Sequence, residues 1–128
     1  MGFFSRNQPT IEFPWIMLRS EEELSEAIGH SHHQPVLFFK HSTRCSISSM
    51  ALDRFVSQWD KSNQCVCYFL DLISYRTVSD QIALRTGVIH QSPQVLVLWK
   101  DEVIYDASHN GINANQIKLE LKKATENE

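Results

Sequence analysis

Cysteine is scarce in this chain of 128 residues, and the three cysteines present are an odd number. So few thiols do not build the disulfide framework of a small secreted domain, and we therefore expect a reducing compartment, the cytoplasm. No run of about 18 apolar residues is present to cross a bilayer. The N-terminus lacks the apolar stretch of a secretion signal, and Arg6 stands where a myristoylation signal requires Ser or Thr.

An excess of charge of one sign is also lacking. The net charge is −3 at pH 7 and no basic run occurs, so neither nucleic acid nor a membrane surface is an expected partner. Hydrophobic residues make up 42% of the chain and charged residues 21%, as in an ordinary soluble globular protein. With no repeats or low-complexity segments, the sequence predicts one domain over residues 13–125. A polar lead-in of residues 1–12 precedes it and a tail of residues 126–128 follows.

Hydrophobic periodicity predicts five strands and four helices. Short apolar runs indicate buried strands at 15–18, 35–41, 66–70, 94–99 and 103–105. Helices are predicted from Ser20 to Gly29, after Cys45, around 75–87 with an end at Gly87, and after Asn113. The order is β-α-β-α-β-α-β-β-α. Crossover helices make the first three strands parallel, and the last two form a hairpin. This order predicts an α/β fold with a central mixed sheet flanked by helices.

Cys45 lies where a buried strand ends and a helix begins. Backbone N–H groups and the positive end of the helix dipole converge at such a junction, and both favour the thiolate that attacks disulfides. Ser48 occupies the place of the second thiol in a Cys-x-x-Cys pair. A lone cysteine is more often structural than catalytic. The position of Cys45 at the strand-to-helix junction is what indicates a redox site with a single thiol.

Four neighbours of Cys45 are candidates for tuning its thiol. Arg44 is adjacent in sequence, and Lys40 and His41 lie at the end of the preceding strand; positive charge close by would favour the thiolate. Ser48 is three residues along the helix, where its hydroxyl can either point at the sulfur or cap an N–H of the first turn.

The other two cysteines and a group of histidines have simpler interpretations. Cys65 and Cys67 point to the same face of a strand that begins at the far end from Cys45, too distant for a disulfide, so we expect them to be core residues. Three histidines at 30–33 fit a solvated polar turn better than a metal site, because neither Asp nor Cys is near. We expect no metal.

Three features together resemble the thioredoxin fold over residues 13–125: Cys45 after the second strand, Ser92-Pro93 before the fourth, and Gly111 before the last helix. The segments Lys40-His-Ser-Thr-Arg-Cys-Ser-Ile-Ser48 and Ser92-Pro-Gln-Val95 are similar to those of the monothiol bacilliredoxins, the YtxJ-like family of the bacillithiol system. That family commonly has proline after the cysteine, where this chain has Ser46. Many thioredoxins hold a buried Asp where this chain has Phe39.

The resemblance implies a monothiol thiol–disulfide oxidoreductase. It implies that the peptide before Pro93 is cis and that Thr43, Ser92 and Pro93 contact the substrate, with the Ser92 backbone pairing with an extended client. The substrates would be proteins carrying bacillithiol in a mixed disulfide, with bacillithiol as a co-substrate and no bound cofactor. Bacillithiol or another redoxin would then reduce Cys45.

Two other functions stay open from the sequence. One is a non-catalytic binding module that holds a partner in the groove at Pro93. The other is an iron–sulfur carrier like some glutaredoxins, in which a protein cysteine and a small thiol hold the cluster. Those glutaredoxins usually contain Cys-Gly-Phe-Ser, where this chain has Cys-Ser-Ile-Ser.

Overall fold

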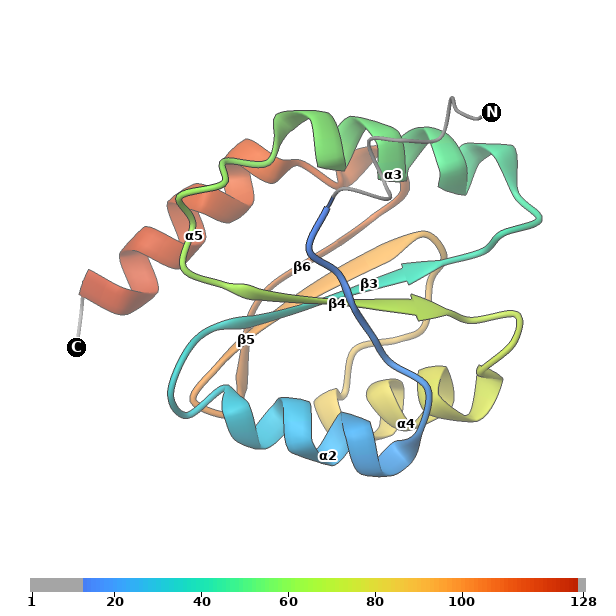
Figure 1. Cartoon of the computed structure of the whole chain (residues 1–128), viewed down its shortest axis with the longest axis horizontal. Helices are drawn as coiled ribbons and strands as arrows, with labels where there is room; N and C mark the ends of the chain where they lie inside the picture. The colour runs from blue at the N-terminus through green and yellow to red at the C-terminus, as the bar shows by residue number, and fades with distance from the viewer. Residues whose placement is uncertain (1–12, 127–128) are drawn as a thin grey trace.

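The computed structural model describes residues 13–126, which form a five-stranded sheet with helices on both faces (Figure 1). The elements in chain order are β2 (Ile16–Met17), α2 (Glu21–His30), β3 (Val36–His41), α3 (Ser46–Gln58), β4 (Val66–Asp71), α4 (Arg76–Thr86), β5 (Gln94–Trp99), β6 (Glu102–Ser108), η1 (His109–Gly111) and α5 (Ala114–Glu126). The predicted lead-in of residues 1–12 lies outside the described residues. So do residues 127–128 of the predicted tail, whose first residue, Glu126, belongs to α5.

The strands follow the order β2-β4-β3-β5-β6 across the sheet. β3 and β2 both run parallel to β4, whereas β5 runs antiparallel to β3 and to β6. The predicted order of elements, the mixed sheet and the final hairpin are therefore confirmed. Lys100 and Asp101 turn the hairpin with positive φ angles of 54° and 70°, the backbone that a tight two-residue turn between twisted strands requires.

β3 lies at the centre of the sheet, and all six of its residues are buried. Alternate side chains point to opposite faces of a strand. Phe39 lies in a core cluster with residues of α3 and α5, whereas Phe38 lies in a second cluster with residues of α2 and α4. Figure 1 shows α3 and α5 above the sheet and α2 and α4 below it. The sheet therefore divides the core into two halves.

The half-core under α3 and α5 is rich in aromatic rings. Phe55 of α3 is central to it, with its ring 5.3 Å from that of Phe39 and 5.9 Å from that of Trp15. Aromatic pairs at such separations contribute about 0.5–1.5 kcal/mol each beyond the burial of their area. The half-core over α2 and α4 is mostly aliphatic. The helix that follows Cys45 is thus fixed to the sheet by rings.

Helix ends agree with the sequence at three of four predicted sites. The Ser20 hydroxyl caps α2 by accepting from the Glu23 N–H, the Asn113 side chain accepts from the Gln116 N–H, and Gly87 ends α4 with φ of 76°. The predicted end of α2 at Gly29 is wrong, because the helix continues to His30. The next residue, Ser31, is buried and donates its hydroxyl to the Ile28 carbonyl, so this end is capped without a left-handed glycine.

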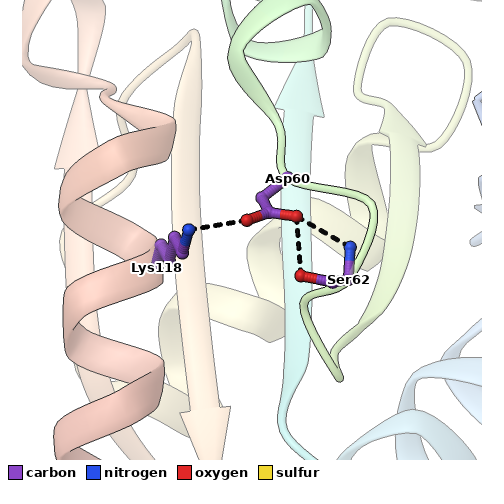
Figure 2. A network of polar contacts seen from close by, with 3 residues as sticks. All are labelled: Asp60, Ser62 and Lys118. Atoms are coloured by element: carbon purple, nitrogen blue, oxygen red, sulfur yellow. Dashed lines mark hydrogen bonds and ion pairs between the residues drawn. The ribbon is translucent and has the colours of Figure 1, made fainter.

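A polar contact joins the segment after α3 to α5 at the surface (Figure 2). Asp60 accepts from Lys118 of α5 at 2.6 Å and from both the hydroxyl and the backbone N–H of Ser62. These hydrogen bonds, led by that from Lys118, hold the pKa of the Asp60 carboxyl well below its usual range.

Of the helices in residues 13–126, none is long and apolar enough to cross a membrane.

Candidate functional site

Cys45 is the residue that immediately precedes α3, at the end of the sheet where β3 finishes. Its backbone is extended, with φ of −118° and ψ of 120°, and its carbonyl accepts from the Ser49 N–H as the helix starts. Its own N–H donates to the Ser42 carbonyl at 3.2 Å, which closes a tight turn. The thiol is half-buried. The sulfur therefore stands beside the first turn of a 13-residue helix, where N–H groups have no helical partner.

The hydroxyl of Ser48 takes part in the hydrogen bonds of this junction. Ser48 is fully buried, and its Oγ accepts from the Ser42 N–H at 3.1 Å. The same oxygen lies 2.7 Å from Nδ1 of His41. The sequence allowed this hydroxyl either to point at the sulfur or to cap an N–H; the bonds that the structure gives it connect α3 to the end of β3. Ser48 thus fixes the strand-to-helix junction around Cys45.

His41 is buried under α3, with its ring 5.5 Å from that of Phe69. Burial lowers the pKa of His41 below its usual value of 6.5, and Asp71 and Asp53 only partly oppose this effect. The imidazole is therefore mostly neutral at pH 7. The sequence predicts His41 as a source of positive charge near the thiol; the structure shows a mostly neutral ring that is hydrogen-bonded to Ser48.

Lys40 lies on the opposite face of the sheet from α3. It is completely buried, and its Nζ donates to Oε1 of Gln94 at 2.9 Å. Because side chains alternate along β3, the ammonium points toward α2 and α4 and away from the helix that carries the thiol. The structure therefore separates Lys40 from the helix that carries the thiol, and its predicted tuning of the thiol stays a prediction. Arg44 and Thr43, by contrast, are exposed in the loop just before Cys45, and their predicted roles stay predictions.

The peptide bond between Ser92 and Pro93 is cis, as the resemblance led us to expect. Lys40 pairs with Gln94 in the antiparallel ladder, so Pro93 comes level with His41, four residues before Cys45. The Pro93 carbonyl accepts from the N–H of His109 at 3.0 Å, which ties this segment to η1. The Ser92 hydroxyl is buried without a hydrogen-bond partner in the described part of the chain. Any contact of Ser92 with a client is therefore expected from its backbone.

A partly apolar surface lies next to Cys45, and the sequence patterns did not predict it. Ile47 and Met50 of α3 are 56% and 66% exposed, and with Arg54, His109 and Asn110 they line a cavity of about 320 Å³. Arg54 donates to the carbonyl of His109. The backbone of His109 has a φ of 55°, which is unusual for a residue other than glycine. The sequence does contain a signal for this surface: Ile47 and Met50 are large apolar residues three apart near the start of the helix, so they lie on one face of it.

Cys65 and Cys67 lie at the other end of the sheet. β3 and β4 are parallel with Val36 opposite Val66, so Cys65 stands beside the start of β3, whereas Cys45 follows its end. Cys67 is buried; Cys65 is partly exposed and lines a cavity of about 610 Å³. A hydrogen bond with Cys67, together with burial, raises the pKa of the Cys65 thiol well above its usual value. This thiol is therefore a poor nucleophile at neutral pH.

The three histidines lie at the surface, at the end of α2 and in the turn that follows it. His30, His32 and His33 are exposed, and the rings of His30 and His33 are 6.3 Å apart. Within residues 13–126, no group of three or more His, Cys, Asp or Glu side chains is arranged to hold a metal ion.

Comparisons with known proteins agree with this geometry. The family model for the monothiol bacilliredoxin BrxC matches residues 16–117. A solved structure described as a proposed oxidoreductase with a thioredoxin fold is 29% identical, with a TM-score of 0.74 over 84% of this chain and 93% of that one. Thioredoxin from Schistosoma mansoni superposes with a TM-score of 0.65 at 14% identity, covering 85% of this chain and 94% of that one. Thioredoxin O1 from Arabidopsis thaliana gives 0.64 at 15% identity, covering 86% and 96%. The last two show the fold alone, and the fold is that of thioredoxin.

Proposed function

The chain belongs to the monothiol bacilliredoxin family, and from this membership we propose that it removes bacillithiol from S-bacillithiolated proteins. Family and fold place it among thiol redox proteins. The position of Cys45 supports the finer proposal most directly. Of the three thiols, it alone follows the end of β3, beside a helix start and at the end of the sheet where the cis Pro93 segment leads into β5. This reaction suits the cytoplasm, where thiols are kept reduced.

The proposed reaction is a thiol–disulfide exchange at Cys45. The Cys45 thiolate attacks the bacillithiol sulfur of the mixed disulfide. A new S–S bond forms between Cys45 and bacillithiol as the bond to the client sulfur breaks, and the electron pair leaves with the client sulfur, which takes a proton from water. Arg44, exposed beside Cys45, is proposed to favour the thiolate. Thr43 and the Ser92–Pro93 backbone are proposed to contact the client.

The cycle needs an external reductant, because Ser48 stands where a dithiol redoxin has its second cysteine. A hydroxyl cannot form a disulfide, and this one is occupied by His41 and the Ser42 N–H. A second bacillithiol molecule or another redoxin must therefore attack the capped Cys45 and regenerate its thiolate.

The test measures release of bacillithiol from an S-bacillithiolated model protein. The wild-type protein and the double variant Cys65→Ala/Cys67→Ala should release it at similar first-turnover rates, whereas Cys45→Ala should release none. Loss of the reaction in the double variant would point to a dithiol cycle. Client binding without release would favour a binding module. A purified protein with the visible absorption of an iron–sulfur cluster would favour the carrier.

A further inference from the structure

Two buried polar side chains on the face away from Cys45 lie next to the cis Pro93 segment. Lys40 of β3 and Gln94 of β5 are paired across the sheet, and they are 0% and 2% exposed. Gln94 directly follows Pro93. The thiol exchange proposed above uses neither side chain, so their burial needs a separate explanation.

The side-chain amide of Gln94 connects three partners. Its Oε1 accepts from Lys40 Nζ at 2.9 Å and from the Gln91 N–H at 3.3 Å. Its Nε2 donates to the Ile89 carbonyl at 3.0 Å. The amide therefore bonds to both ends of residues 89–91, which directly precede Ser92–Pro93, and Lys40 in turn bonds to the amide.

An ammonium in this place carries an energetic cost. The half-core around it is aliphatic, and burial lowers the pKa of Lys40 from 10.5 to about 8, with Asp80 only partly opposing. At neutral pH the group is mostly charged and desolvated. Replacing a buried charge with an apolar residue of similar size is often neutral or stabilising, so packing alone does not explain a lysine here.

The other titratable groups facing this site come from α4 and the following loop. His90 lies with its Nδ1 3.4 Å from the hydroxyl of Ser79, a buried residue of α4. Burial, then Lys40 and Arg76, lower the pKa of His90, and Asp80 opposes. At neutral pH His90 is therefore mostly uncharged, and Asp80 is the acid whose charge acts on Lys40.

We propose that Lys40 is a positioning residue for client capture, which acts through Gln94 to hold residues 89–93 at the end of the sheet where β3 finishes and Cys45 follows. The proposal rests on the proposed role of the Ser92–Pro93 backbone in binding clients. Lys40 then touches neither the client nor the thiol. It determines where the strand-like edge that receives the client lies relative to the sulfur.

The test compares Lys40→Met with Lys122→Met, which removes the same charge from the exposed surface of α5. In Lys40→Met, the client concentration at half-maximal single-turnover rate should rise about tenfold, because a hydrogen bond to a charged group is lost. Alkylation of Cys45 by iodoacetamide should stay within about twofold, and stability at pH 7 should be kept or raised. Lys122→Met should change none of these.

A second variant and a second readout separate the possible explanations. Gln94→Glu keeps an acceptor for Lys40 and Gln91 but loses the donor to Ile89, so an intermediate loss of capture is expected. Amide exchange at Gln91 should quicken in Lys40→Met while that at Ser49 in α3 does not. This exchange rate measures whether Lys40 holds Gln91 through Gln94, even if the wild-type protein proves inactive on bacillithiolated clients. Unchanged capture and unchanged exchange would overturn the proposal, as would equal losses in capture and alkylation.

Discussion

The two faces of the sheet share the same central strands but differ in the side chains that they bury. The face under α3 and α5 is aromatic. Its buried polar groups, His41 and Ser48, are hydrogen-bonded to each other at the start of α3. The face over α2 and α4 is aliphatic, and its buried ammonium, Lys40, bonds to the strand that follows Pro93. One face fixes the start of the helix that follows Cys45, and the other holds the segment that we propose receives the client.

Neighbouring residues of β3 belong to different half-cores. Lys40 and His41 are adjacent in sequence, yet the pleat of β3 sends them to opposite half-cores. Both pKa values are lowered by burial, but the consequences at pH 7 differ: Lys40 stays mostly charged and His41 is mostly neutral. The comparison teaches that closeness to a cysteine in sequence does not establish an electrostatic effect on its thiol.

The largest expected effect separates Cys45 from the other thiols. Cys45→Ala should reduce release of bacillithiol from a client to the uncatalysed rate, because no other described thiol lies at that end of the sheet. Thermal unfolding should stay close to that of the wild type, since the side chain is only half-buried. The control Cys67→Ala should show the reverse, full release with lower stability. Release by Cys45→Ala above the uncatalysed rate would contradict the proposal that Cys45 is the reacting thiol.

The next effect tests the aromatic half-core that fixes α3. Phe55→Ala should lower the free energy of unfolding by about 3–5 kcal/mol, because it removes the ring at the centre of the cluster. Ile82→Val on the aliphatic face should cost only about 1 kcal/mol. Urea denaturation of both variants measures the difference. A loss in Phe55→Ala no larger than that of removing one methylene in Ile82→Val would mean that the Phe55 ring contributes little to holding α3 on the sheet.

A smaller effect concerns the pH dependence of stability contributed by Lys40. Its pKa is 10.5 in the unfolded chain and about 8 in the folded protein, so between these values the unfolded state binds more protons. The free energy of unfolding should therefore rise with pH across this range, by at most about 3 kcal/mol. Lys40→Met should lack the rise, which urea melts at pH 7, 8.5 and 10 would detect. A rise of the same size in the variant would place its source elsewhere.

The smallest expected effect concerns His41 and an acidic range of pH. Because burial lowers its pKa below 6.5, the unfolded state binds more protons as the pH falls below that value, and stability should decline. His41→Leu should reduce this decline. His90, whose pKa is also lowered, contributes separately from the other face, so His90→Leu serves as the comparison. A decline that is steeper in His41→Leu than in the wild type would show that the buried ring is not neutral.

The sequence predicted the fold because its local signals agreed with each other. Apolar runs, the caps at Ser20 and Asn113, and Gly87 each act within a few residues, and the structure has all of them. The cis peptide before Pro93 came from the family resemblance and is confirmed. α2 ran past Gly29 because Ser31, buried against its last turn, supplies the cap instead.

The partners of the polar side chains could not be predicted in the same way. The Lys40–Gln94 bond joins residues 54 apart in sequence, and only the register of β3 against β5 brings them together. Ser48 lies one helical turn from Cys45, but its hydroxyl bonds to the Ser42 N–H and to His41, which come from the end of β3 and the loop before Cys45. Alternation along β3 predicts that Lys40 and His41 diverge; it does not identify what each one meets.

The most direct test of the account is to map where the small thiol resides after one turnover. Wild-type protein is mixed with an equimolar S-bacillithiolated client, quenched by acid, and digested for mass spectrometry of its three cysteine peptides. We expect bacillithiol on the Cys45 peptide alone, a free client thiol, and unmodified Cys65 and Cys67. Bacillithiol on either of those two residues, or a disulfide that links one of them to Cys45, would contradict the claim that a single thiol carries the reaction.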